Sequence, residues 1–400
     1  MPFGMPIVDT DTHITEPADT WTARMSTKKW GDMVPHVKYD ETLKEEFWFV
    51  GDKVLVPACM TAQAGWDKPF PSHPPTYAEA HPASFEAKAR LELMDGLGIY
   101  AQALYPNVGG FGSQLWRTME DQELALDCVR AYNDMLFDWT SVDPDRFISI
   151  CAIAFWNVDA AVKEIERVAG LGARGIIFSG APQLHEQPFL ADKHWDPVWS
   201  AAQDAGLPVS FHVGSGDMTA QFSMQRIAVE GMAVTYARAS TALFFDTAMQ
   251  LTDLLLSGIL PRFPELSFVS VESGIGWLPF LLEAADYHFI EGDVRTNRPE
   301  FEELPSFYFD RQVFASYWFE QVAPHKLMDE IGADRILFET DFPHPTCLHG
   351  DRVHEAIRNG LKDVSDEVRR KILYENACKL YNIDESKALA FGAEHAAIIA

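Results

Sequence analysis

The chain has 400 residues, of which 47% are hydrophobic, and a formal net charge of −27. This acidity argues against nucleic acid or an anionic membrane as a partner, and no apolar run approaches the roughly 20 residues that span a bilayer. The five cysteines are widely spaced without a CxxC pair, and the N-terminal MPFGMPIVDTDTH lacks a signal-peptide pattern, so a cytoplasmic protein with reduced thiols is expected.

Eight short apolar runs recur along the chain and are predicted to be strands. They span residues 6–13, 101–107, 146–154, 173–180, 207–214, 266–274, 312–320 and 335–344. Continuous apolar runs of this length are typical of strands that are buried on both faces of a parallel sheet. Amphipathic segments such as 121–140 and 158–172 lie between them and are predicted helices. This alternation predicts an α/β fold, a (β/α)8 TIM barrel formed as a single domain by residues 1–400.

Two stretches exceed a minimal barrel and are predicted to be insertions. Residues 17–85 follow the first strand, are rich in Pro and Trp, and contain GDKVLVPA at 51–58, which fits a short hairpin. Residues 215–240 follow the fifth strand and are rich in Met, Gln and Ala. Segments that follow strands lie at the C-terminal face of a barrel, so both insertions are expected to wall the active site. The tail, residues 363–400, is predicted to be helical.

Polar side chains stand where four of the predicted strands end, which is where barrel enzymes carry their chemistry. Asp11 and His13 alternate along the first strand, so both side chains project to one face. The later strand ends add His212, Glu272, Asp341 and His344. Taken singly, such residues also serve as core histidines, backbone-bonded carboxylates or turn residues. Together they indicate a divalent metal (Zn, Mn or Fe), because burying so many carboxylates without a cation is unfavourable.

Several longer motifs cover nearly the whole chain. They are IVDTDTHITEP (7–17), HWDPVW (194–199), LPVSFHVGSG (207–216), RFPELSFVSVESGIGWLPFLLEAAD (262–286), RILFETDFPHP (335–345) and KILYENACKLY (371–381). With these motifs and their spacing, the sequence resembles the amidohydrolase-related branch of the amidohydrolase superfamily, which includes aminocarboxymuconate semialdehyde decarboxylase and resorcylate decarboxylase. The resemblance implies a TIM barrel with one divalent metal bound by Asp11, His13, His212 and Asp341.

The chain departs from that family at the end of the sixth strand. The decarboxylases commonly carry an acid/base histidine there, whereas this chain has Glu272. Glu272 and Glu16 are predicted as further metal ligands, and Glu16 has a loop salt bridge or helix cap as its alternative. Asp341, Glu272 and His344 are the predicted catalytic residues, and His344 has a ligand or turn role as alternatives. The site is expected to hold one metal ion, or two.

Metal-assisted hydrolysis of a small apolar or aromatic substrate is the first predicted function, with Asp341 accepting the proton of a metal-activated water. The first alternative is non-oxidative decarboxylation of an aromatic or enol acid. Its carboxylate could be bound by Arg24, Arg174, Arg226 or Arg238. The second alternative is an O2-activating hydroxylase with a dinuclear Fe or Fe/Mn centre. The last is a non-catalytic partner subunit.

The substrate is expected to be a small molecule held partly by the insertions. Asn107, which follows the second strand, together with Trp66 and Phe222 from the two insertions, is predicted to contact it. The family resemblance further implies a homo-oligomer, most simply a dimer.

Overall fold

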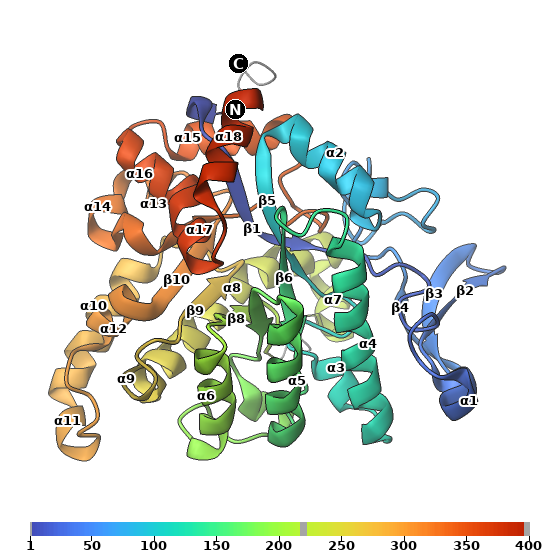
Figure 1. Ribbon diagram of the computed structural model, residues 1–400, viewed down its shortest axis with the longest axis horizontal. Helices are drawn as coiled ribbons and strands as arrows, with labels where there is room; N and C mark the ends of the chain where they lie inside the picture. The colour runs from blue at the N-terminus through green and yellow to red at the C-terminus, as the bar shows by residue number, and fades with distance from the viewer. Residues whose placement is uncertain (1, 217–221, 396–400) are drawn as a thin grey trace.

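The computed structural model describes residues 2–216 and 222–395 and centres on an eight-stranded parallel barrel (Figure 1). Its strands are β1 (Ile7–His13), β5 (Ile99–Tyr105), β6 (Phe147–Ala152), β7 (Gly175–Ile177), β8 (Val209–His212), β9 (Phe268–Val271), β10 (Val313–Tyr317) and β11 (Ile336–Phe338). They pair in sequence order, and every pair is parallel. The strands are buried on both faces, as their continuous apolar sequences predict.

The barrel closes where the residues after its last strand, β11, meet the end of its first strand, β1. The backbone N–H of His13 donates to the carbonyl of Phe342 at 2.7 Å, and that of Asp341 donates to the carbonyl of Asp11 at 2.9 Å. A parallel bridge joins Thr12 to Phe342. These contacts bring the first and last predicted site segments together, and the predicted (β/α)8 TIM barrel is confirmed.

Helices surround the barrel, and the described part of the chain after β11 is largely helical (Figure 1). In chain order they are α1 (Thr27–Trp30), α2 (Ala87–Leu97), α3 (Gln114–Arg117), α4 (Gln122–Thr140), α5 (Val158–Leu171), α6 (Asp196–Asp204), α7 (Met224–Glu230), α8 (Met232–Leu256), α9 (Ile259–Arg262), α10 (Leu278–Glu291), α11 (Val294–Asn297), α12 (Pro305–Gln312), α13 (Val322–Lys326), α14 (Met328–Ile331), α15 (Asp351–Gly360), α16 (Asp366–Arg370), α17 (Asn376–Leu380) and α18 (Glu385–His395). The side chains of Asp121 and Asn157 cap the first turns of α4 and α5, the two helices predicted at 121–140 and 158–172. No helix in the described ranges is both long and apolar enough to cross a membrane.

The stretch predicted as the first insertion contains a small antiparallel sheet that projects from one side of the barrel (Figure 1). Its strands are β2 (His36–Asp40), β3 (Glu45–Val50) and β4 (Lys53–Pro57). The predicted hairpin at 51–58 contributes only the turn and the second strand, because β3 lies before it. Trp48 of β3 anchors the sheet by packing edge-on against the buried Trp21, with ring centroids 4.8 Å apart.

The stretch predicted as the second insertion holds α7 and the first part of α8, and residues 217–221 of it lie outside the described residues. The predicted end at residue 240 does not match an element boundary, because α8 continues to Leu256. The sequence between Met232 and Leu256 contains neither Gly nor Pro, and the next glycine, Gly258, stands two residues beyond the helix. A surface segment and a barrel helix are thus one continuous helix.

Candidate metal centre

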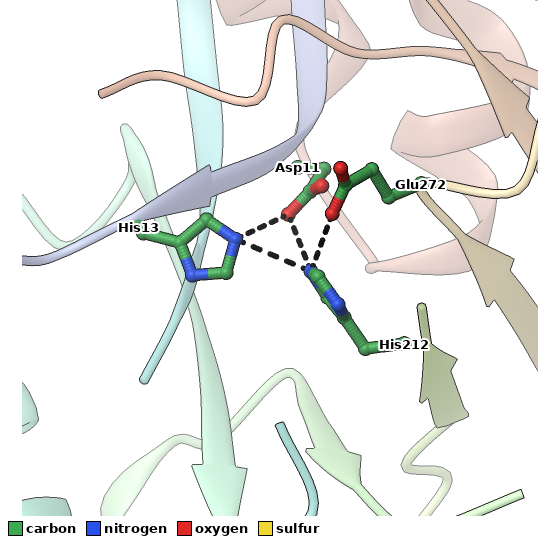
Figure 2. A group of neighbouring side chains, drawn as sticks. All are labelled: Asp11, His13, His212 and Glu272. Carbon is green, nitrogen blue, oxygen red and sulfur yellow. Dashed lines mark hydrogen bonds and ion pairs between the residues drawn. The ribbon is translucent and has the colours of Figure 1, made fainter. Parts of the chain in front are cut away.

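Three strands bring four side chains of the types that bind metals to one point at the C-terminal mouth of the barrel. Asp11 and His13 end β1, His212 ends β8, and Glu272 directly follows β9. Figure 2 shows the four side chains pointing toward a common centre. One donor atom of each lies within 4.8 Å of all the others. Asp11, His13 and His212 are fully buried, whereas the Glu272 side chain is 17% exposed.

The hydrogen bonds of the two imidazoles leave a lone pair of each directed at this centre. His13 Nδ1 lies 3.2 Å from the carbonyl oxygen of Pro106, and His212 Nδ1 lies 2.8 Å from that of Val213. A carbonyl oxygen only accepts, so each Nδ1 carries the proton and each Nε2 has a free lone pair. The two Nε2 atoms are 3.2 Å apart and lie 3.4–3.5 Å from Asp11 Oδ1. Acceptors at these distances require a cation or a proton between them.

A second donor group overlaps the first. Its members, again with donor atoms within 4.8 Å of one another, are His13, Glu272, Asp341 and His344. Asn107 Nδ2 donates to the carbonyl of Ile14 at 2.7 Å, which orients the amide so that its Oδ1 accepts from His344 Nε2 at 2.6 Å. His344 Nδ1 is therefore the unprotonated nitrogen, and it faces Asp341 Oδ1 at 2.9 Å.

Burial shifts the pKa of these groups toward their neutral forms. It raises the pKa of Asp11 and, together with the charge of Glu272, raises that of Asp341 well above its ordinary range. Burial also raises the pKa of Glu272 to about 8. The same burial lowers the pKa of His13 and His344 well below the usual value for histidine. A cluster with these properties is electrostatically unfavourable unless a cation compensates its carboxylates.

Unpartnered oxygens show that the donor set fits a divalent cation. Both carboxylate oxygens of Asp11, Oδ1 of Asp341 and Oε1 of Glu339 are buried and have no hydrogen-bond partner. Burial opposes the charged form of His212, yet the Asp11 carboxylate raises its pKa, so the pair attracts positive charge. Imidazole and carboxylate donors suit Mn, Fe or Zn, and the cluster contains no thiolate.

Two of these carboxylate residues have an unusual backbone conformation. Glu272 has φ 52° and Asp341 has φ 59°, in the left-handed region that non-glycine residues rarely adopt. The backbone N–H of Glu272 donates to Ser316 Oγ at 3.1 Å and to Glu339 Oε2 at 3.2 Å, which holds this turn. Backbone conformations of this kind persist where surrounding contacts maintain them, and they concentrate at functional sites.

A buried polar network supports the end of β1 and was not foreseen from the sequence. Arg90 donates to the carbonyl of His13 at 2.7 Å and to Thr12 Oγ1 at 3.2 Å. Asp9 accepts from Gln102 Nε2 at 2.9 Å and from the hydroxyl of Thr340 at 2.7 Å, which ties β1 to both of its neighbours. The sequence feature that could have revealed this network is the presence of polar residues inside otherwise apolar strands. Such residues need hydrogen-bond partners when they are buried.

Glu16 and Trp66 are not brought into their predicted positions. Glu16 Oε1 accepts from the backbone N–H groups of Asn107 at 2.8 Å and Val108 at 3.0 Å, and Glu16 belongs to neither donor group. Its carboxylate is thus bound by the loop after β5. Trp66 donates from Nε1 to Ser72 Oγ at 3.1 Å and does not line the cavity over the site. Both side chains are thus bonded to protein groups, Glu16 also lines the cavity, and the ligand role of Glu16 and the substrate contact of Trp66 stay predictions.

A cavity of about 670 Å³ opens above the two donor groups, and it is lined by Glu16, Asn107, Phe222, Glu272, Asp341 and His344 among others. Phe222 and Asn107 therefore stand at the predicted place, although both polar ends of the Asn107 side chain are already bonded to protein. Phe111, which the sequence analysis missed, packs against all three imidazoles with centroid separations of 5.1, 4.5 and 5.7 Å. Phe111 lies in a loop, where no hydrophobic periodicity marks it in the sequence as a residue of the site.

Comparison with known proteins decides the family. The sequence profile of the family described as "Amidohydrolase" matches residues 8–383. The chain belongs to this amidohydrolase family. The resemblance inferred from the motifs is therefore confirmed, and the barrel and the polar strand ends described above are those of a member of this family.

Three individual proteins illustrate the similarity. A gamma-resorcylate decarboxylase of Rhizobium sp. (strain MTP-10005) is 26% identical over 314 residues, covering 74% of this chain and 86% of that protein. The crystal structure of an amidohydrolase from Mycobacterium avium subsp. paratuberculosis K-10 superposes with a TM-score of 0.72 at 25% identity, covering 94% and 99% of the two chains. A dihydroxybenzoic acid decarboxylase from Polaromonas sp. JS666, crystallised with manganese and 2-nitroresorcinol, shares the fold with a TM-score of 0.60 at 19% identity, covering 96% and 99%.

Proposed function

We propose that this amidohydrolase-family protein is a metal-dependent decarboxylase that releases CO2 from an aromatic acid. The observation that carries the proposal is the convergence of imidazole lone pairs and buried carboxylates beneath an apolar cavity. Similarity to a gamma-resorcylate decarboxylase across 86% of that protein supports it. Decarboxylation thereby takes the place of hydrolysis, the function predicted first from the sequence.

The residues that would hold the metal are Asp11, His13 and His212, with Glu272 and Asp341 beside them. Manganese is the first candidate because the donor set suits it and the Polaromonas relative binds it. A bound divalent ion would supply the positive charge that compensates the substrate carboxylate. Phe111 packs against the imidazoles on their cavity side and keeps water from their faces.

Glu272 is the proposed acid because its side chain is the most exposed to the cavity of the clustered carboxylates. As the bond between the ring carbon and the carboxylate breaks, CO2 leaves and the electron pair stays on the ring carbon. The Glu272 carboxyl then gives its proton to that carbon and is reprotonated from solvent. Asn107 orients His344 so that its unprotonated Nδ1 faces Asp341 Oδ1, where a proton on Asp341 or a bound cation would lie between the two atoms.

The proposal is tested by CO2 release from a panel of hydroxybenzoates, including 2,6-dihydroxybenzoate, by protein loaded with Mn²⁺. Metal-free protein and Glu272→Gln are the controls, and the variant is expected to keep its metal while losing turnover. If the loaded wild-type protein released no CO2 from any member of the panel, the proposed activity would be rejected.

The second donor group favours one further candidate, an O2-activating hydroxylase with a dinuclear Fe or Fe/Mn centre. The overlap of the two groups at His13 and Glu272 is the specific observation, because it offers donors for a second ion beside the first. Metal analysis and O2 consumption separate the candidates. Two ions per chain including iron, with O2 uptake, support the hydroxylase, and one ion without O2 uptake supports the decarboxylase.

The homodimer and the cytoplasmic location stay predictions from the sequence and the family resemblance. Sedimentation analysis of the purified protein tests the first, and fractionation of the producing cells tests the second. The non-catalytic alternative predicts no turnover of any substrate despite an intact metal site.

A further inference from the structure

The cavity is large for the chemistry at its base. Its volume of about 670 Å³ lies in the middle of the range of roughly 300–1,000 Å³ that pockets for drug-sized ligands occupy. A single benzoate ring bound at the metal centre would leave most of this space to water. Apolar side chains form most of the wall, so filling the space with water would be unfavourable.

The outer part of the cavity is built by segments beyond the minimal barrel. Phe70, from the segment after β1, stacks on Tyr236 of α8 with ring centroids 4.6 Å apart and planes inclined by 29°. Val56 and Met60, which belong to the same chain segment as Phe70, also line the cavity. Leu243 of α8 lines it as well. The segment after β1 and helix α8 are therefore two walls of the cavity, and they meet where Phe70 packs on Tyr236.

An aromatic group forms another part of the cavity wall. Phe244 of α8 lies 5.7 Å from Trp318 and 5.7 Å from Phe319, both of which follow β10. All three line the cavity. Rings held at these separations and inclinations present faces and edges against which another ring can pack.

The charges in the lining restrict where an anionic group of the substrate can lie. Among the described residues that line the cavity, Arg352 is the single Lys or Arg, and its guanidinium donates to the carbonyl of Cys347 at 3.3 Å. Glu16, Glu272 and Asp341 line the same cavity. One carboxylate can be compensated at the metal centre and another anionic group at Arg352, whereas an anionic group elsewhere in the apolar part would be buried without a partner. Arg24 and Arg174, two predicted carboxylate-binding residues, are instead bound to Asp138 and to backbone carbonyls.

We propose that the substrate is a bulky apolar acid of at least two rings, whose carboxylate lies at the metal centre while its second ring lies between the two walls. This inference rests on the proposed decarboxylase function. It makes Met60 and Leu243, on opposite walls, residues that determine specificity by size.

Calorimetric binding to the Mn²⁺-loaded protein tests the proposal with two probes, 2-hydroxybenzoate and 2-hydroxy-3-phenylbenzoate. The wild-type protein is expected to bind the two-ring acid about ten-fold more tightly, because the second ring is buried against aromatic side chains. Leu243→Trp and Met60→Trp each fill the outer space from one wall. Each is expected to reduce this preference below about three-fold and to leave the binding of 2-hydroxybenzoate unchanged within about two-fold.

Phe245→Trp is the matched control, since Phe245 is 64% exposed on α8 and does not line this cavity. It is expected to keep the ten-fold preference. Thermal unfolding of each variant checks that it is folded. Because Met60 and Leu243 lie on separate segments, the second variant still tests the proposal if the first does not fold. Equal or tighter binding of 2-hydroxybenzoate by the wild-type protein would overturn the proposal, as would filling variants that retain the preference.

CO2 release from both acids separates this inference from the proposed function. If 2-hydroxybenzoate has the higher kcat/KM, the decarboxylase stands and the size inference is wrong. If neither acid releases CO2 but 2-phenylphenol binds more tightly than phenol in the wild-type protein and not in Leu243→Trp, the decarboxylase is wrong and the bulky-ligand inference stands.

Discussion

The base and the roof of the cavity are built in opposite ways. The base consists of strand ends, where Asp11, His13 and His212 are fully buried and every imidazole proton is assigned to a carbonyl. The roof consists of added segments, where Phe70 and Tyr236 meet by ring packing alone. Barrel strands are held in register by backbone hydrogen bonds, so the base is suited to chemistry that needs fixed donors. The roof is free to vary with the substrate.

Removing a ligand at the base is expected to have the largest effect. His212→Ala should lose both the metal and activity, by about 10³-fold or more, because several kcal/mol of charge stabilisation depends on the ion. Metal content by mass spectrometry and kcat/KM measure the two losses. Phe222→Ala, a change at the roof, is the matched comparison and should keep its metal. Full metal occupancy in His212→Ala would show that the assigned ligand set is wrong.

Glu16 stands between base and roof, and its burial predicts a pH effect on stability. Burial raises its pKa from the ordinary 4.5 to about 7. A raised carboxyl pKa means that the folded protein binds the proton more tightly than the unfolded chain does. The contribution of the protonated Glu16 to the free energy of unfolding is therefore complete below pH 4.5, and it is lost as the pH rises to about 7.

Glu16→Gln removes this titration while keeping a side-chain acceptor for the N–H groups of Asn107 and Val108. The free energy of unfolding of the variant should rise relative to wild type by about 3 kcal/mol between pH 4.5 and pH 7. Denaturant titrations at both pH values measure the difference. A constant difference across this range would mean that Glu16 is ionised in the folded protein.

A change behind the base should reduce turnover without removing the ion. Asn107→Leu leaves the Nε2 of His344 without its acceptor, so the ring no longer presents Nδ1 to Asp341 in a fixed tautomer. Partners of this kind are worth about 10–100-fold in activity, and the loss should fall on kcat rather than KM. Steady-state kinetics with metal analysis test it, and an effect confined to KM would instead assign Asn107 to substrate contact.

The smallest effects are expected from the two aromatic residues predicted to contact substrate. Phe222→Ala should raise KM for a bulky acid several-fold, because Phe222 lines the cavity. Trp66→Ala should leave KM within about two-fold, since its indole bonds Ser72 away from the cavity. Equal increases of KM in both variants would mean that Trp66 reaches the substrate after all.

The predicted strands were close to those observed because each depends on a local pattern. The D-x-H sequence placed Asp11 and His13 on one face, and the structure shows both directed at the same centre (Figure 2). Glu272 and His344 were correctly placed at the mouth for the same reason, as they lie at the C-terminal ends of predicted strands. Glu16 was predicted as a ligand but lies outside both donor groups, because it follows β1 in a loop whose path depends on the amides that it binds.

The sequence by itself determined the barrel, the family, and the strand ends that carry imidazole and carboxylate groups, since alternation along a strand and the closure of a parallel sheet are local and general rules. Only the tertiary structure decided which donors form which group and which residues orient them. His212 meets His13 across 199 positions of sequence, and Asn107 orients His344 across 237. It also decided that Phe70 and Tyr236 close one cavity, because packing between distant segments depends on shape that no local pattern encodes.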